Sequence, residues 1–429
     1  MVKNLTTLTA LALLAACGGG AFPGVLGGQA DAGAAQAAPD GGGTSTAGGD
    51  GGGSSPDGGT AASGTGCGSG GGGPTGGPAD LFPCDSPWYK DVSASAVAAE
   101  SASIVSAIGS AGGWGLSNHF QLDFSAALIH GDASTRREVW VQPRDASDPN
   151  EYDPTESDLV SGNRAWSVPM PAGGKLEGES GYDCPVTSSG LRKNDCHLTV
   201  VDDSRHLLIE LYSAGWDAAS GKWFVTQESA WNLLHSYGAA ERGRGCTSAN
   251  AAGLPQGPGV IGIRETQAAA REPGGYLRHA LRFALPPDRI RRAFVAPASH
   301  TQTEATSSGG PPFGARLRLK ASFDESRVSS AGGKVVLRTL KKYGMVLTDG
   351  GQTILTADDD TFTRQGDASL VWGSTLRPLD LDGLLPSDFE VVDYDASTWG
   401  TNTGCVSGVD KAPLASITPQ GFSRRGRRR

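Results

Sequence analysis

Two neighbouring segments that carry histidine, aspartate and glutamate give this sequence its clearest candidate chemistry. Residues 196–212 (CHLTVVDDSRHLLIELY) form two runs of alternating apolar residues around an Asp-Asp-Ser turn, a hairpin pattern. With Asp203 and Ser204 as a two-residue turn, His197 falls directly opposite Glu210. A carboxylate that holds an imidazole in one tautomer is the usual way to prepare a general base. The alternative interpretation is a structural cross-strand pair, and a three-residue loop would shift the register and remove the pairing.

Two further carboxylates complete the predicted catalytic set. Glycoside hydrolases use two carboxyl groups roughly 5–10 Å apart, whereas a lyase needs a base and a cation that neutralises a uronate. Glu210 and Asp202 are the candidate acid and base. His197 would orient them or relay protons, with Asp123 assisting.

A row of cations supplies the candidate substrate-binding residues. Arg316, Arg318 and Lys320 alternate with apolar residues and share one strand face. Three like charges side by side repel one another unless anions lie close to them. These anions could be protein carboxylates or an acidic ligand such as a uronate-bearing glycan. Arg316 and Lys320 are therefore candidates, together with Arg282 and Trp231.

Other chemistry-bearing motifs are sparse. The sequence has no HExxH, P-loop, GxSxG or CxxC motif, so it predicts no metal and no cofactor. The run 358–360 (DDD) suits calcium or, as the alternative, a solvated turn. His279 shares an apolar face with Leu277 and Leu281, which is typical of a core histidine.

The first residues indicate export. Lys3 precedes a short apolar stretch at 5–14, and the chain then reads Leu-Ala-Ala-Cys up to Cys17, as in a bacterial lipobox. The alternative is an ordinary secretory signal. We expect lipidation at Cys17, attachment to a membrane through that lipid, and outer-membrane sorting because Gly18 rather than an aspartate follows.

Composition sets the domain limits. Residues 18–79 are Gly, Ser, Ala, Thr, Pro and Asp, which predicts a disordered tether, and 80–423 is one β-rich domain. The formal net charge of −9 disfavours nucleic acid as a partner. The basic tail 424–429 suits contact with anionic lipid or lipopolysaccharide, or a solvated, frayed end.

The remaining six cysteines fit an oxidising compartment. Cys184 and Cys196 bracket a short loop, and Cys84 with Cys405 would pin the two ends of the domain together.

Most segments of the domain alternate with period two, which indicates strands. Helical periodicity is clear only at 95–108 and 334–343. Many strands with long loops and few helices predict a mainly β fold, a β-sandwich or jelly-roll-like core. The predicted strands are 120–124, 139–141, 197–201, 206–213, 222–226, 277–285, 293–297, 315–323 and 345–347.

Several segments together resemble a group of largely uncharacterised exported bacterial proteins. The matching pieces are 85–88 (DSPW), 196–202 (CHLTVVD), 210–212 (ELY), 246–255 (CTSANAAGLP), 277–283 (LRHALRF), 314–320 (GARLRLK), 343–351 (YGMVLTDGG) and 387–392 (SDFEVV). The resemblance spans nearly the whole domain and therefore implies one domain. Similar proteins tend to have aspartate where this chain has Asn250.

Two functions follow as hypotheses. The first is a cell-surface enzyme that degrades a polysaccharide by hydrolysis or lyase chemistry. The second is a non-catalytic glycan-binding or adhesion lipoprotein on the same fold, which uses aromatic side chains as a stacking platform. Trp216, Trp223 and Trp231 are the tryptophans that suggest sugar contact.

Overall fold

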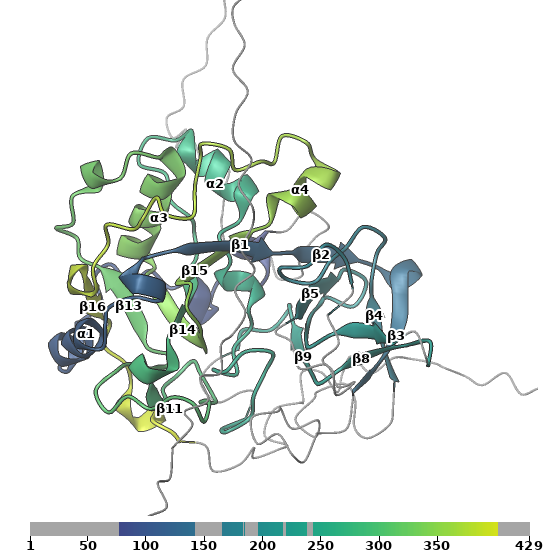
Figure 1. The fold of residues 1–429 in the computed structure, drawn as a ribbon, viewed down its shortest axis with the longest axis horizontal. Helices are drawn as coiled ribbons and strands as arrows, with labels where there is room; N and C mark the ends of the chain where they lie inside the picture. Colours follow the sequence, from purple (N-terminus) through teal and green to yellow (C-terminus); the bar gives the residue numbers. More distant parts are fainter. Residues whose placement is uncertain are drawn as a thin grey trace, which may run out of the picture. The chain divides into compact units, whose positions relative to one another are not determined.

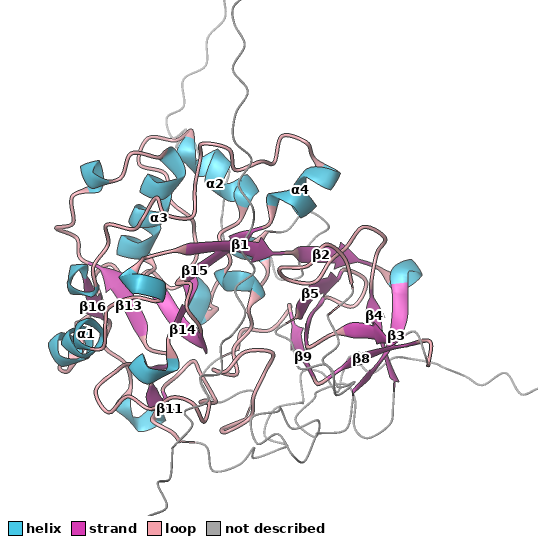
Figure 2. Cartoon of the chain, viewed as in Figure 1, coloured by secondary structure: helices cyan, strands magenta, loops and turns pink. Residues whose placement is uncertain are grey.

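Strands make up more of the described structure than helices do, and Figure 2 distinguishes the two by colour. The computed structural model describes residues 77–141, 165–182, 184, 196–217, 220–237 and 243–401. Within this part the fold is mainly β with four α-helices, which confirms the β-rich prediction. The signal segment, the tether and the basic tail lie outside the described residues.

The largest sheet has six strands and mixed direction. In order across the sheet they are β1 (Leu122–Ala126), β15 (Leu355–Asp358), β10 (Leu281–Leu285), β14 (Met345–Gly350), β13 (Arg316–Leu319) and β16 (Phe389–Val391). β1 pairs with β15 and β10 with β14 in parallel, while β13 is antiparallel to both its neighbours. Parallel neighbours require long crossover connections, which the period-two pattern alone did not reveal.

Two four-stranded sheets share a second, smaller core. One has the order β2 (Leu128–Gly131), β5 (His197–Asp202), β6 (Leu207–Tyr212) and β9 (Gln227–Asn232); the other has β4 (Ala165–Pro169), β3 (Arg136–Val141), β8 (Lys222–Val225) and β7 (Gly215–Asp217). Apolar residues from both, such as Val200 and Ile209 of the first and Val139 and Val168 of the second, pack together. This is a sandwich-like arrangement.

The chain passes directly from the large sheet to the sandwich. β1 ends at Ala126 and β2 begins at Leu128, so that the two strands lie nearly end to end in Figure 1. The face of the first four-stranded sheet that carries Val201, Leu208 and Trp231 packs against the large core. That sheet is therefore buried on both faces, and polar residues within it need internal partners.

Four helices lie against the large sheet or its edges. They are α1 (Ser101–Ser110), α2 (Ile263–Ala270), α3 (Ala331–Lys342) and α4 (Asp360–Gly366). α3 begins where the Ser330 hydroxyl accepts a hydrogen bond from the Gly333 amide, and it ends before Gly344, whose φ of +67° suits glycine. Among the described residues, no helix has the length and apolar character needed to cross a bilayer.

A short parallel pair, β11 (Arg291–Phe294) and β12 (Pro312–Phe313), completes the described strands. The predicted helix at 334–343 corresponds to α3. The helix predicted at 95–108 starts only at Ser101, because Val97 bridges to Val392 and the Ala98 amide bonds to the Val391 carbonyl. The sequence missed β9, whose buried residues are largely polar.

Candidate functional site

The 196–212 hairpin forms, but with a longer turn than the sequence predicts. Asp202 pairs with Leu207, so Glu210 lies opposite Thr199 and His197 lies opposite Tyr212. The direct pairing of His197 with Glu210 was therefore wrong. Asp202 causes the difference, because its carboxylate accepts hydrogen bonds from the backbone amides of Ser204 and Arg205 and so builds a wider turn.

His197 pairs instead with a glutamate that the sequence did not single out. Its Nδ1 lies 3.3 Å from Oε2 of Glu177, and its Nε2 lies 2.7 Å from the Ala249 carbonyl oxygen. Both ring nitrogens of His197 are thus engaged by groups inside the protein, which is the arrangement of a structural histidine rather than of a general base directed at a substrate.

Glu177 joins this histidine to Arg282. Nη2 of Arg282 donates to Oε1 of Glu177 at 2.7 Å, and its Nη1 donates to the side-chain oxygen of Gln256. Burial alone would raise the pKa of Glu177, but Arg282 and His197 outweigh burial and hold that pKa well below its usual range. Arg282 is thus internally paired with Glu177 and Gln256, and its role in substrate binding stays a prediction.

Glu210 is linked to the same group of residues through Gln256. It is fully buried, and its Oε1 accepts the backbone amides of Gln256 at 2.7 Å and Gly257 at 3.1 Å. Its Oε2 accepts from the Trp231 indole at 3.2 Å. Burial raises the pKa of Glu210, and this effect outweighs the lowering of the pKa by the three hydrogen-bond donors. We call His197, Glu177, Arg282, Gln256 and Glu210 the buried network.

The buried network leaves almost no room for a ligand. The cavity that it lines holds space for about one water molecule. Nε of Arg282 is buried there without a hydrogen-bond partner within the described part of the chain. A sugar ring cannot enter this cavity, so the predicted catalytic centre at His197 and Glu210 lacks access for a polysaccharide.

Asp202 lies on the other face of its sheet from Glu210. It is fully buried, and Arg136 and Arg205 both form ion pairs with it, at 3.1 Å and 2.6 Å. Burial alone would raise the pKa of Asp202, but hydrogen bonds from Arg136 and Ser204 and the charge of Arg205 lower it. The structure therefore does not bring the predicted acid–base pair of Glu210 and Asp202 together, because strand alternation places the two carboxylates on opposite faces of the sheet.

Two other predicted residues lie around the buried network. Asp123 accepts a hydrogen bond from the Ser125 hydroxyl at 2.8 Å, and this hydroxyl also lies 3.3 Å from Oε1 of Glu177. Trp231 is 2% exposed and packs edge-on against Tyr237, so too little of its ring is accessible for a sugar to stack on it. Sequence order gave no signal for Glu177, which lies in a glycine-rich loop.

A larger cavity, of about 490 Å³, lies elsewhere on the domain. The segments 84–92, 296–297, 314–316 and 392–395 line it. Its charged and phenolic residues are Asp85, Lys90, Arg316, Asp393, Tyr394 and Asp395. We call this cavity the Arg316 groove. Of the predicted site residues that the structure describes, Arg316 and the disulfide candidate Cys84 line it, and Arg316 is the only one predicted to bind substrate.

The three cations of the β13 row have different partners. Arg318 forms an ion pair with Glu390, its cross-strand partner on β16, at 2.5 Å. Lys320 is exposed and donates to the Ser387 carbonyl at 2.8 Å, outside the groove. Arg316 lies opposite Val346 and, within the described residues, donates to the carbonyls of Pro87 at 2.6 Å and Lys90 at 3.2 Å and to no other group.

An aromatic cavity adjoins the Arg316 groove, and Ser86, Pro87 and Pro297 line both. Phe82, Trp88, Trp231 and Tyr237 supply its aromatic side chains. It has room for only one or two water molecules, so it extends the wall of the groove rather than forming a separate site.

His279 is a core histidine, as expected. Its Nε2 lies 2.9 Å from Oε1 of Glu265, and its Nδ1 lies 2.9 Å from the Ala280 carbonyl oxygen.

The acidic run 358–360 is divided among separate partners. Asp358 accepts the Ile263 amide, Asp359 bonds to Lys175, and Asp360 accepts the Trp372 amide. Within the described ranges, no group of three His, Cys, Asp or Glu side chains is arranged to hold a metal ion.

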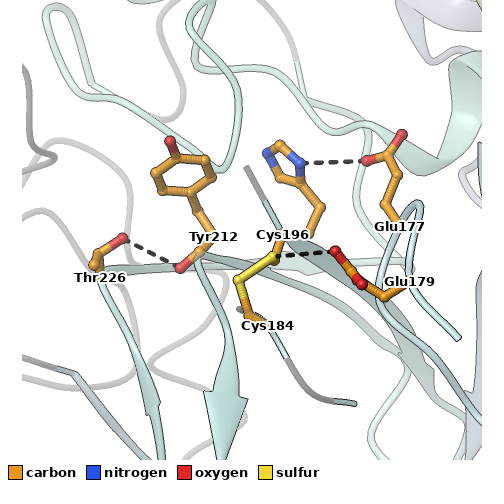
Figure 3. Close-up of a disulfide and its surroundings, with 7 residues drawn as sticks. Glu177, Glu179, Cys184, Cys196, Tyr212 and Thr226 are labelled. Carbon is orange, nitrogen blue, oxygen red and sulfur yellow. Dashed lines mark hydrogen bonds and ion pairs between the residues drawn. A yellow bond between two sulfur atoms is a disulfide. The ribbon is translucent and has the colours of Figure 1, made fainter. Parts of the chain in front are cut away.

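Cys184 and Cys196 form a disulfide, with Cα atoms 5.9 Å apart. Figure 3 shows Glu177, Glu179 and Tyr212 around it. Since Cys196 directly precedes His197, this bridge anchors the start of β5 beside the buried network. Cys84 and Cys246 are also disulfide-bonded, while Cys17 and Cys405 lie outside the described residues, so pairing of Cys84 with Cys405 stays a prediction.

Asn250 organises the 246–255 loop instead of lining a cavity. Its side-chain oxygen accepts the amides of Ala252 and Leu254, both at 3.1 Å, and its Nδ2 donates to the Leu254 carbonyl at 2.6 Å. The resemblance of this loop to the exported bacterial group stays a prediction. No family model, curated protein or solved structure matches the chain.

Proposed function

We propose that this domain binds polysaccharide in the Arg316 groove without cleaving it. The observation that carries the proposal is the charge pattern of the groove. It brings cations and carboxylates to one cavity of about 490 Å³, yet no ion pair within 4.0 Å joins them in the described part of the chain. Side chains that face a cavity in this way are suited to hydrogen bonds with hydroxyl groups of a ligand.

Binding fits the groove better than catalysis does. Hydrogen bonds from the Ser397 hydroxyl and amide lower the pKa of Asp395, so this carboxyl stays ionised and does not serve as a proton donor near neutral pH. Burial and the neighbouring Glu100 raise the pKa of Tyr394, which therefore keeps its proton and is a poor base. Both groups are matched to hydrogen bonding rather than to proton transfer.

The proposed location follows from the sequence. A lipid on Cys17 and the predicted tether at 18–79 would hold the groove away from an outer-membrane surface, where polysaccharides are abundant. Such a tether favours capture of a large polymer over turnover of a small molecule.

The test is titration of the full chain with a panel of soluble polysaccharides, followed by calorimetry. Asp393→Ala removes an exposed groove carboxylate, and we expect it to weaken binding about tenfold or more. Lys320→Met is the matched control outside the groove and should bind like the unaltered chain. Binding by no polymer, equal binding by Asp393→Ala, or release of new reducing ends would overturn the proposal.

A further inference from the structure

Arg316, which is half-buried, differs from Arg282 and Arg318, the two buried arginines of the same sheet. Arg282 has Glu177 at 2.7 Å and Arg318 has Glu390 at 2.5 Å, so each of those guanidinium groups has a carboxylate counter-ion. Among the described residues, no carboxylate lies within 4.0 Å of Arg316. Its two carbonyl partners satisfy hydrogen bonds but do not neutralise its charge.

The sequence explains why this cation lacks a counter-ion. In the antiparallel pairing of β13 with β16, Glu390 falls opposite Arg318, and the next position on the Arg316 side is Val392, whose amide bonds to the Arg316 carbonyl. On the other side Arg316 pairs with Val346. Both flanking positions are apolar, so neither neighbouring strand supplies a carboxylate to pair with the Arg316 guanidinium.

Desolvation makes the absent counter-ion energetically important. Burial lowers the pKa of Arg316 to about 10, which reflects the loss of water around a charged group. An anion that binds beside it would compensate that loss, and a guanidinium still has donors left after two carbonyl contacts.

A second cation lies on the same wall. Lys90 is exposed, lines the groove, and offers to Arg316 only its backbone carbonyl. Of the three groove carboxylates, Asp85 accepts from the Ser236 hydroxyl and Asp395 from the Ser397 amide. Among the described residues, none of the three, Asp393 included, forms an ion pair within 4.0 Å with Arg316 or Lys90, so both cations remain available to an anion in the groove.

From this arrangement we infer that the Arg316 groove selects sugars that carry a carboxylate, that is, polymers of hexuronic acid. The inference rests on the proposed glycan-binding function. Arg316 and Lys90 would hold the uronate carboxylate, and Asp393 and Asp395 would accept hydrogen bonds from ring hydroxyls. A neutral sugar would form only the hydroxyl contacts with Asp393 and Asp395.

The experiment uses matched polymers that differ in charge alone. Polygalacturonate, alginate and a glucuronan are each compared with their carboxyl-reduced, neutral counterparts by calorimetric titration of the full chain at low salt. We expect at least one acidic polymer to bind about tenfold tighter than its reduced form, because charge-assisted hydrogen bonds to Arg316 are lost on reduction.

Variants then assign the selectivity to the cationic wall. Arg316→Met should reduce the acidic preference to about threefold or less, and Lys90→Met, which alters an exposed side chain, should reduce it partly. Lys320→Met should keep the full preference. Equal binding of acidic and reduced polymers, or an unchanged preference in both Arg316→Met and Lys90→Met, would overturn the inference while leaving glycan binding intact. Binding of neither form would overturn the proposed function as well.

Discussion

The buried network and the Arg316 groove differ in how their charged side chains are paired. In the buried network, Arg282 and His197 converge on Glu177, and Gln256 links this group to Glu210. In the groove, Arg316 and Lys90 have no carboxylate within 4.0 Å among the described residues. Internal pairing marks a group that stabilises the fold, whereas charge left facing a cavity marks a group available to a ligand.

Residue type alone therefore misleads about function here. Histidine and glutamate on neighbouring strands suggested a catalytic centre, yet the partners of His197 and Glu210 are groups inside the protein: Glu177 and the Ala249 carbonyl for His197, and the Gln256 and Gly257 amides and the Trp231 indole for Glu210. The comparison predicts that the two regions respond differently to substitution: the buried network through folding stability, and the groove through binding.

The largest expected effect is on Glu177. Glu177→Gln removes the carboxylate shared by His197 and Arg282 and leaves the buried Arg282 guanidinium without a counter-ion, which should lower the free energy of unfolding by about 3 kcal/mol. Chemical denaturation measures this change. Glu179→Gln in the same loop is the control, and a loss of similar size there would contradict the special role of Glu177.

A smaller loss is expected at Glu210. Glu210→Gln keeps one acceptor oxygen but replaces the other by an amide group, which cannot accept the hydrogen bond now made by either the Trp231 indole or the Gln256 and Gly257 amides. We expect a destabilisation of about 1–3 kcal/mol in denaturant unfolding, with glycan binding unchanged once the protein is folded. Loss of glycan binding by a folded Glu210→Gln protein would show that Glu210 takes part in binding.

The buried network should also affect how the free energy of unfolding changes with pH in the acidic range. The folded-state pKa of Glu177 lies below its ordinary value of 4.5, so its contribution is fully present above that pH and is lost as the pH falls through the folded pKa. The stability difference between the unaltered chain and Glu177→Gln should therefore narrow below about pH 4.5. A difference that widens on acidification would contradict the assigned pairing.

The sequence predicted the β-rich fold and the strands around these regions, but not their connections. Alternation correctly placed His197 and Thr199 on one face of β5, because the period-two rule depends only on the strand itself. The hairpin register failed, since the Asp202 carboxylate bonds to turn amides and widens the loop. Glu177 was unpredictable, because it reaches His197 from a distant loop rather than from a patterned strand.

The smallest expected stability effect belongs to the groove. Arg316→Met removes two hydrogen bonds to carbonyls but also a desolvated charge, so the free energy of unfolding should change by less than about 1 kcal/mol. Lys320→Met, at an exposed position, should change it by less than about 0.5 kcal/mol. Thermal unfolding of both variants measures this. A loss at Arg316 as large as that at Glu177 would make Arg316 a structural cation as well.

Hydrogen–deuterium exchange of the full chain, with and without a saturating polyuronate that it binds, tests the central contrast most directly. We predict slower exchange on ligand addition in the groove segments 84–92 and 392–395, and no change in the hairpin 196–212. Protection of the hairpin with no change in the groove segments would contradict this account and would place the ligand at the buried network.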